Sequence, residues 1–394
     1  MLHQIPQRVV NHQGLNLPVS QDTHIPNNLK HETVIVPSTN QPSWGSYFVF
    51  DFKEKSLTLH DLTIQFNVSA LGGLTAARYS TAFSWISRIE ILINNQVIDT
   101  VYPETQFLLQ NIFNWDEDRT YLNNSAGSYS STTQRTTLAS ATNDYFLQLK
   151  TFFDQTHVDL LYPKDDVQLR VYMNPLTKVA VGTGAGPATS TINYANLICR
   201  ITRNGSDINS SKMHHLSKQV HHHKFLETRY GTYGLRSGNT SYTIVLNSIV
   251  GKVDFLLFVI RPNDWTGDGF HQFTPLSSFS ILDATSTNIT GGQPISSALC
   301  LGKLAKDFAK STYLCETAIG TTDNKANAYF FSFSADAADA VETGRSYNHF
   351  KFVGNEQLQL QFATAPTAAF TVDVYAFCQS VLEVSPSYVK KASL

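Results

Sequence analysis

One ordered set of strand patterns occurs twice in this 394-residue chain, and the repetition restricts the folds open to it. In each half an alternating strand comes first, a strand followed by a helical pattern comes second, and a strand before a proline comes third. The second copies lie about 190 residues after the first: 252–260 after 61–68, 279–310 after 88–113, and 352–366 after 162–175. This offset predicts two copies of one structural unit, in which Ile91 corresponds to Ile281. Chance alignment between strands of a β-rich chain is the alternative.

Each half has the pattern of a sandwich of two antiparallel sheets. In 87–98, Arg88 and Glu90 alternate with Ile89 and Ile91, which is the period of a half-buried strand. Helical periodicity is limited mainly to 103–113 and 298–310. The sequence therefore predicts an all-β chain with minor helix, built as two tandem eight-stranded jelly-roll β-sandwiches. An immunoglobulin-like topology is the alternative, but each half is longer than that smaller fold requires.

Polar stretches with little periodicity suggest where these units begin and end. Long Ser/Thr/Asn-rich connections at 114–143 and 177–193 are expected to be surface loops. The predicted organisation is an N-terminal arm at 1–35, a first jelly roll at 36–210, a His-rich linker at 211–224, a second jelly roll at 225–385 and a C-terminal tail at 386–394.

The composition favours a chain that buries surface against neighbouring molecules. Hydrophobic residues make up 42% of the chain and charged residues 15%, which is low for a soluble protein. A formal net charge of −2 argues against a dedicated nucleic-acid binder, whose affinity comes largely from phosphate neutralisation. The first ten residues lack the apolar core of a secretory signal, and the longest apolar run, 255–260, is too short to span a bilayer. The cysteines have no metal-binding spacing, so reduced thiols are expected at Cys199, Cys300, Cys315 and Cys378.

Three motifs suggest chemistry, but each has a simpler interpretation. The acidic run 116–118 lacks the glycine that a calcium loop needs at its sixth position, where Tyr121 stands. The stretch 182–187, GTGAGP, is followed by no helical pattern and no Gly-Lys-Ser/Thr, so a flexible loop is expected rather than a phosphate site. Turn chemistry explains 263–271, where Asp264, Asp268 and His271 are the candidate acid–base residues. The sequence therefore predicts no enzyme, no catalytic or cofactor-binding residue and no metal site.

The segment 212–225, KMHHLSKQVHHHKF, contains five of the thirteen histidines. It falls between the two predicted rolls. On a strand His221 and His223 share a face while His222 takes the other, so the three cannot converge on one metal ion. Because histidine titrates between about pH 7 and 5.5, a pH-sensitive junction is expected in preference to a zinc site.

Several strand ends resemble a known family of viral proteins. In 86–113 a strand ends in Asn-Asn-Gln and is followed by a short return strand and a helix. This order resembles the early part of the double jelly-roll major capsid proteins of tailless icosahedral DNA viruses, which include lipid-containing phages, adenovirus-like viruses and polinton-like elements. The segments 221–235 and 250–264, with the strand end FVIRP at 258–262, look like the beginning of the second roll of such a protein.

The resemblance implies a structural role in a virion. It implies a homotrimer whose six rolls form a pseudo-hexagonal capsomer that tiles an icosahedral shell and is assembled in the host cell interior. The implied partners are neighbouring capsomers and minor capsid or penton proteins, with an internal membrane facing the N-terminal arm as a further partner, and without sequence-specific binding of nucleic acid.

Two other classes of function fit a pair of jelly rolls. A carbohydrate-binding or attachment module would need a concave platform of exposed aromatic side chains. A two-sandwich glycan-amidase-like enzyme would need paired carboxylates facing one cleft, and Asp264 and Asp268, its best candidates, lie in one turn.

Overall fold

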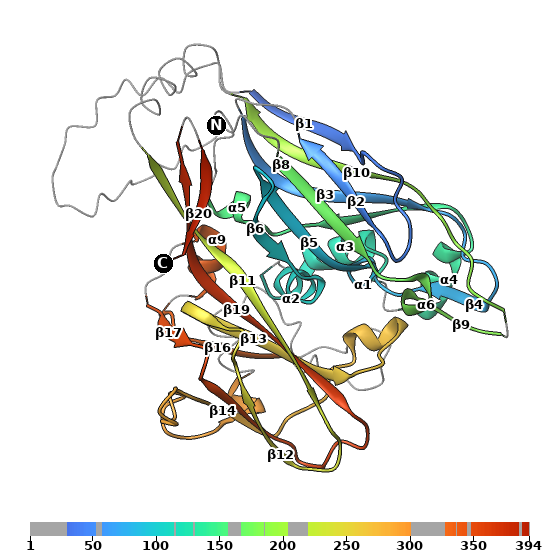
Figure 1. Cartoon of the computed structure of the whole chain (residues 1–394). Helices are drawn as coiled ribbons and strands as arrows, with labels where there is room; N and C mark the ends of the chain where they lie inside the picture. The colour runs from blue at the N-terminus through green and yellow to red at the C-terminus, as the bar shows by residue number, and fades with distance from the viewer. Residues whose placement is uncertain are drawn as a thin grey trace, which may run out of the picture.

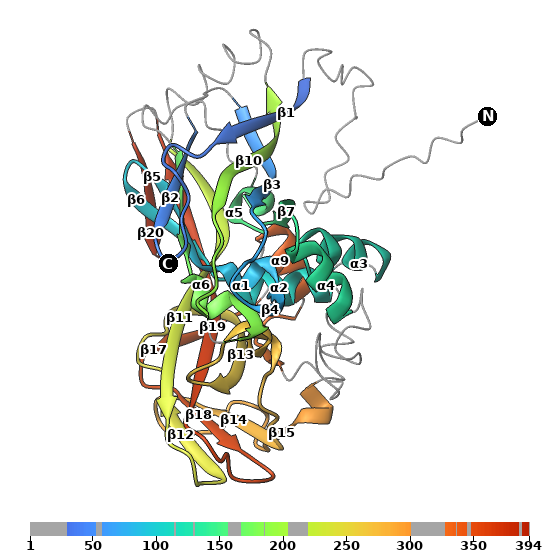
Figure 2. The same cartoon turned by 90° about the vertical axis from the view of Figure 1, so that its right-hand side faces the viewer.

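Two β-sandwiches lie beside each other in the computed structural model (Figures 1 and 2). The structure describes residues 30–52, 57–113, 116–128, 131–156, 167–184, 186–203, 220–300, 328–335, 337–344, 348–385 and 388–393. Within these ranges no helix has the length and hydrophobicity that crossing a membrane requires.

The first sandwich, the first roll, contains two four-stranded sheets, ordered β1-β10-β3-β7 and β2-β8-β5-β6. Their strands are antiparallel throughout. The bounds are β1 (Lys30–Pro37), β2 (Tyr47–Phe52), β3 (Leu57–Val68), β5 (Ile86–Ile93), β6 (Gln96–Val101), β7 (Asn143–Gln148), β8 (Val167–Met173) and β10 (Ile192–Arg203). A separate ribbon joins β4 (Thr75–Tyr79) to β9 (Ala180–Thr183).

The second sandwich, the second roll, is built on sheets ordered β11-β19-β13-β16 and β12-β18-β14-β15. Two further strands extend the first of these sheets, since β17 pairs with β13 and β20 pairs with β19. The bounds are β11 (His221–Leu235), β12 (Ser241–Val245), β13 (Val250–Pro262), β14 (Ser278–Leu282), β15 (Ile295–Ser296), β16 (Ala328–Ser332), β17 (Phe350–Val353), β18 (Gln357–Gln361), β19 (Phe370–Val384) and β20 (Val389–Ser393).

The two rolls have the same strand order. Strands β1, β10, β3 and β7 take the places that β11, β19, β13 and β16 take in the second roll, and the other sheets correspond in the same way. The pairs found in the sequence fall on equivalent strands: β3 with β13, β5 with β14, and β8 with β18. The predicted double jelly roll is therefore confirmed, and the repeated sequence pattern reflects a repeated topology.

Helices connect the strands of the first roll. The predicted helix at 103–113 is confirmed as α2 (Pro103–Phe113). Of the helix predicted over 298–310, only residues 298–300 lie within the described ranges, and they are helical. The prediction of one irregular connection over 114–143 was wrong, because it contains α3 (Asp116–Ser125) and α4 (Thr132–Ala139). The Ser131 hydroxyl caps α4 by accepting from the amide of Gln134, so a threonine-rich segment with weak helix propensity still forms a helix.

Each sandwich has an aromatic core between its sheets. In the first roll Trp85, at the end of α1 (Ala82–Trp85), packs edge-on against Tyr145 with ring centroids 4.7 Å apart. In the second roll Phe258 of β13 meets Phe279 of β14 at 5.0 Å, again edge-on. Such contacts hold facing sheets together beyond simple area burial.

Strands also extend into three segments that the sequence assigned to connections or ends. β1 begins at Lys30, β11 begins at His221, and β20 occupies 389–393. Along β19, the pairing with β13 ends at Cys378, and the pairing with β20 begins at Ser380. The end of the chain thereby satisfies backbone groups of β19 that β13 leaves unpaired.

Candidate functional site at the seam between the rolls

The second roll buries the central part of one face of its β11-β19-β13-β16 sheet against the first roll, and we call this interface the seam. Along β19, Val372 and Val374 face the core of the second roll, while Asp373 and Tyr375 face the first roll and are nearly inaccessible to solvent. The covering elements of the first roll include β6 and α2 (Figure 1). Since both faces of β19 are buried, the rolls form one continuous packed body.

Aromatic rings fill the middle of the seam. Tyr102, between β6 and α2, contacts Tyr230 of β11 and Tyr375 of β19, with ring centroids 4.7 and 5.5 Å apart. Tyr230 and Tyr375 stack on each other at 5.2 Å. Deeper in the seam, Phe107 of α2 packs against Phe270 at 6.0 Å.

A buried ion-pair cluster joins the two rolls beside these rings. The guanidinium of Arg261, at the end of β13, lies 2.5 Å from a carboxylate oxygen of Glu104 in α2 and 2.9 Å from one of Asp373 in β19. The Tyr230 hydroxyl donates to the other Asp373 oxygen at 2.7 Å. Burial alone would lower the pKa of Arg261, but the two adjacent carboxylates outweigh it and raise that pKa. The cluster holds three charges inside the protein because each has an opposite charge in contact.

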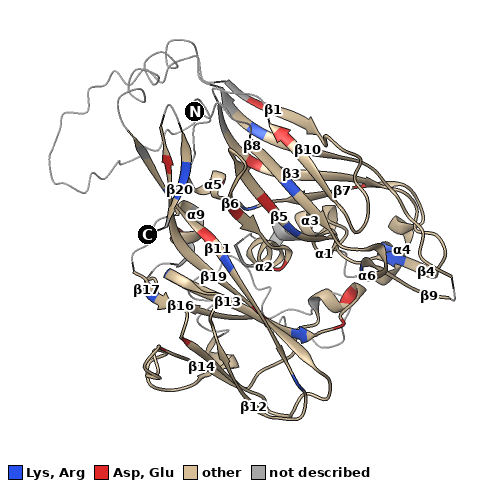
Figure 3. Ribbon diagram, in the orientation of Figure 1, with Lys and Arg blue, Asp and Glu red and all other residues tan. Residues whose placement is uncertain are grey.

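A second ion-pair cluster lies away from the centre of the seam. Asp268 belongs to η1 (Gly267–His271) of the second roll and pairs with Arg78 of β4, at 2.8 Å, and with Arg135 of α4, both of the first roll. In Figure 3, basic and acidic positions lie near each other where α4 and β4 meet the second roll. Burial acts to raise the pKa of Asp268, but hydrogen bonds from the two arginines lower it overall. The carboxylate therefore remains ionised as an anchor between the rolls.

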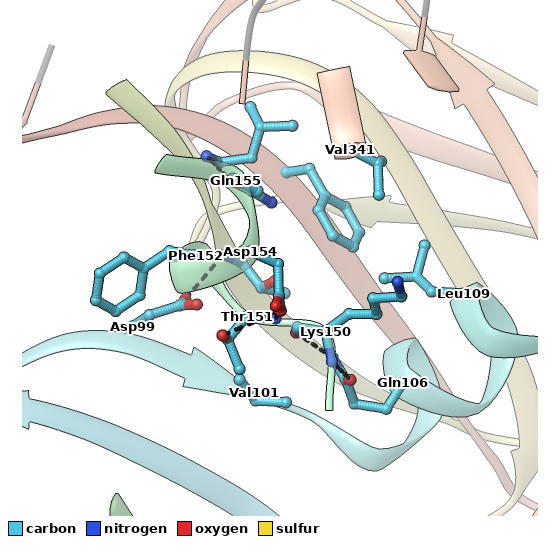
Figure 4. A pocket seen from close by; sticks show the side chains of 13 residues that line it. Asp99, Val101, Gln106, Leu109, Lys150, Thr151, Phe152, Asp154, Gln155 and Val341 are labelled. Carbon is cyan, nitrogen blue, oxygen red and sulfur yellow. Dashed lines mark hydrogen bonds between the residues drawn. The ribbon is translucent and has the colours of Figure 1, made fainter. Parts of the chain in front are cut away.

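A cavity of about 250 Å³ opens where β6, the segment 149–155 and β11 meet (Figure 4). Its polar lining residues are Asp99, Gln106, Lys150, Thr151, Asp154, Gln155 and Thr228. Most of these groups bond to backbone: the amide of Gln106 pairs with the backbone of Lys150, and Asp154 accepts from the Thr151 N–H at 2.9 Å. These bonds fix the segment that leads into α5 (Phe152–Thr156) against the seam.

Asp99 is the most strongly perturbed carboxyl group of this cavity. One oxygen accepts from the backbone N–H of Thr100 at 2.9 Å and, more weakly, from that of Thr228 at 3.5 Å. Burial raises its pKa to about 6, and the nearby carboxylate of Glu227 adds to the effect. The group can therefore change its protonation state at mildly acidic pH.

The last described strand, β20, is fastened to both rolls beside Asp99. The ammonium of Lys391 donates to the Ile98 carbonyl of the first roll at 3.0 Å and contacts a Glu227 oxygen of the second at 2.6 Å. Glu227 is also held by Arg229, at 2.6 Å. One lysine near the end of the chain thus bridges the seam.

The ion pairs of the seam hold the two rolls in place, and the candidate acid–base residues do not form a catalytic pair. Asp268 is engaged by arginines and Asp264 is exposed, so the acid–base pair considered for the 263–271 turn does not come together. Within the described parts of the chain, no three side chains of metal-ligating type converge. Burial raises the pKa of the Cys199 and Cys378 thiols to about 12, which keeps them protonated.

The other sequence candidates lie away from the seam clusters or outside the described residues. The acidic run 116–118 begins α3, so its backbone is helical and is not a calcium loop. Residues 182–183 of the GTGAGP motif belong to β9, which pairs with β4. His221, His222 and His223 lie in β11 and pair with the end of β19, and His222 is exposed. The pH-sensitive junction stays a prediction for these histidines.

Sequence reasoning missed the ion-pair cluster at the centre of the seam. A signal for it exists in the strand end FVIRP, where Arg261 follows an unbroken apolar run. A continuous apolar strand is buried on both faces, so a charged residue at its end needs a buried partner. The partners Glu104 and Asp373 lie far away in the sequence, and no local pattern connects them.

The fold is similar to that of solved viral capsid proteins over nearly the whole chain. A chain of the PBCV-1 virus capsid is 15% identical with a TM-score of 0.69, covering 93% of this chain and 97% of that one. The Faustovirus major capsid protein is 9% identical with a TM-score of 0.65, covering 91% of each chain. The mavirus major capsid protein is 9% identical with a TM-score of 0.54, covering 100% of this chain and 97% of that one. No protein-family model and no curated protein matches the sequence.

We expect Asp99→Asn to stabilise the protein at neutral pH. Folding raises the pKa of this carboxyl from about 4 to about 6. Its protonated form therefore stabilises the fold fully below about pH 4, and this stabilisation is lost as the pH rises through about 6. The amide mimics the protonated acid, so the free energy of unfolding should rise by about 2 kcal/mol at pH 7.5 and change little at pH 4. Denaturant unfolding at fixed protein concentration, repeated from pH 4 to 8, measures this difference.

The matched control is Asp264→Asn, because Asp264 is an exposed aspartate of the second roll. It should leave the unfolding free energy within about 0.5 kcal/mol of the wild type at every pH. A stability difference for Asp99→Asn that is the same at pH 4 and pH 7.5 would contradict the proposed titration.

We expect Arg261→Met to destabilise the chain by about 3–5 kcal/mol, because Glu104 and Asp373 would remain buried without a cation. The partly exposed Arg88, which pairs with Glu90, provides the control, and Arg88→Met should cost at most about 1 kcal/mol. If Arg261→Met does not fold, adding Glu104→Gln and Asp373→Asn should recover a folded protein. A loss no larger than that of the control would show that the cluster does not hold the seam. Thermal and denaturant unfolding measure all of these variants.

Proposed function

We propose that this chain is the major capsid protein of an icosahedral DNA virus. The observation that carries the proposal is the full-length match of its two equivalent rolls to viral major capsid proteins. The seam supports the same conclusion, because it makes the two rolls one rigid unit of the kind that repeated assembly needs. The protein then acts by packing against its neighbours, and the virion is its place of action.

The capsomer in this proposal is a homotrimer with six similar rolls. Two rolls of equal topology in one chain allow three chains to occupy a six-fold lattice position with one gene product. The low content of charged residues suits a chain that is surrounded by copies of itself. Neighbouring capsomers and minor capsid or penton proteins would be its further partners. We also propose that the N-terminal arm faces the interior of the shell and an internal membrane there.

The purified chain is expected to form a stable trimer of about 130 kDa, three times the 43.9 kDa of the chain. Light scattering coupled to size-exclusion chromatography measures this mass directly. A folded monomer at micromolar concentration would contradict the capsomer.

Electron micrographs of particles purified from cells that express the chain test the larger claim. Trimers that never join into curved or closed shells, even with other virion proteins present, would favour an attachment module instead. Binding of glycans by such isolated trimers would support that alternative.

A further inference from the structure

The cavity of about 250 Å³ at the seam is built from both rolls (Figure 4). β6, α2 and the segment 149–155 of the first roll form one part of its wall. β11, α9 (Ala337–Thr343) and β19 of the second roll form the rest. Binding sites for small molecules occur preferentially at such junctions between domains. A molecule bound in this cavity would contact both rolls at once.

Much of the wall is apolar. Its hydrophobic residues are Val101, Leu109, Phe152, Leu226, Val341 and Phe377. An apolar cavity of about 150 Å³ is large enough to bind benzene, so the volume of this cavity has room for roughly ten non-hydrogen atoms. The cavity therefore suits a small organic molecule with an apolar body.

The carboxylate of Asp99 is a buried polar group of this wall that can accept further hydrogen bonds. Only 5% of the residue is exposed. Both hydrogen bonds that it accepts go to the same oxygen, Oδ1, from the N–H groups of Thr100 and Thr228. Within the described parts of the chain, its other oxygen, Oδ2, accepts none. A carboxylate has about four acceptor sites, so Oδ2 is open to a donor in the cavity.

Asp99 also lacks a positive charge in contact with it. Among the described residues no lysine or arginine forms an ion pair with this carboxylate, and Lys391 acts on it from a distance, because that ammonium contacts Glu227 and the Ile98 carbonyl. The negative charge of Glu227 opposes the ionisation of Asp99. A buried carboxylate without a cation in contact costs free energy, which is why burial raises the pKa of Asp99 to about 6.

The other charged groups of the wall do not supply that positive charge. Asp154 is itself a carboxylate, and its two oxygens accept from the N–H groups of Asp61 and Thr151. Lys150 is exposed, so its ammonium can remain in water. The cavity thus combines an apolar wall with one carboxylate oxygen that is open to a cation.

We propose that the cavity binds a small organic amine in its protonated form, with the ammonium on Oδ2 of Asp99 and the apolar body against the hydrophobic wall. The ammonium supplies an opposite charge and a charge-assisted hydrogen bond. Because the molecule binds the folded chain and contacts both rolls, it stabilises that chain in proportion to its affinity and concentration. The proposal does not depend on the capsid role, since every group it uses lies within one chain.

Isothermal titration calorimetry of the full-length protein with 2-phenylethylammonium and hexylammonium tests the site. Each probe has one ammonium and an apolar body of the expected size. We expect at least one of them to bind once per chain with a Kd of roughly 1 mM or tighter. The matched probes are 2-phenylethanol, which is neutral, and 3-phenylpropanoate, which is negative. Both should bind at least about tenfold more weakly, because neither can form the ion pair.

The affinity should depend on pH through Asp99. A carboxyl with a pKa of about 6 is almost fully ionised at pH 7.5 and about one-tenth ionised at pH 5. An alkyl amine, with a pKa of about 10, keeps its proton throughout this range. The Kd for the ammonium probe should therefore rise about tenfold from pH 7.5 to pH 5. The Kd for 2-phenylethanol should stay the same.

Asp99→Asn removes the charge and nearly keeps the shape of the side chain. It should abolish binding of the ammonium probes, although the same substitution is expected to stabilise the protein without a ligand at pH 7.5. Thermal unfolding separates the two effects: the ammonium should raise the Tm of the wild type and of the exposed control Asp264→Asn, but not that of Asp99→Asn.

Val341→Phe tests the place of binding and leaves Asp99 unchanged. Val341 belongs to α9 and lines the cavity, so a larger side chain there takes up part of the volume. The variant should weaken binding of the ammonium probe at least about tenfold, and circular dichroism checks that it is folded.

Four results would overturn the proposal. The first is that neither ammonium probe binds at about ten times the expected Kd. The second is equal affinity for an ammonium and for the neutral or negative probe. The third is equal binding by the wild type and Asp99→Asn. The fourth is undiminished binding by folded Val341→Phe, which would place the ammonium outside the cavity. A chain that binds the ammonium as expected but forms no trimer would contradict the capsomer alone.

Discussion

The relative placement of the two rolls depends on the buried guanidinium of Arg261. It contacts Glu104 from the first roll and Asp373 from the second, so neither carboxylate could be buried in the seam without it. Hydrophobic contacts alone would tolerate sliding between two sheets, since they have no direction. A cation between two carboxylates tolerates far less, because a displaced roll would leave a charge unpaired. The aromatic rings around the cluster then add buried apolar area to the arrangement that these charges fix.

This constraint explains how one topology can serve two roles in the chain. Strands β13 and β19 are buried on both faces along most of their length, while their counterparts β3 and β10 have an outward face that is partly exposed. The duplicated unit thus has one contact used inside the chain and one equivalent surface that none of the described residues covers. A rigid seam gives that surface a fixed direction, and a fixed direction is what separates a closed ring from an open chain of subunits.

Much of the fold could be predicted from the sequence, because local periodicity reports sheet faces directly. The matches of 61–68 with 252–260 and of Ile91 with Ile281 fall on equivalent strands. The helices in 114–143 escaped prediction, since their threonines and asparagines favour loops until a cap such as Ser131 and tertiary packing stabilise them. The seam clusters could not be predicted either. Arg261 gives a local signal, but its partners are brought to it by strand order alone.

The seam contains carboxylates whose responses to acid have opposite sign. The two arginines lower the pKa of Asp268 in the folded protein. Its contribution to the free energy of unfolding is therefore present above the pKa of an unfolded aspartate, about 4, and is lost only as the pH falls below that value. The pKa of Asp99 is raised to about 6 by burial, so protonation between pH 6 and 4 relieves a buried charge and strengthens the seam. Mild acid should therefore leave the two-roll unit intact. Acid sensitivity of an assembly would thus arise in contacts between copies and not within the chain.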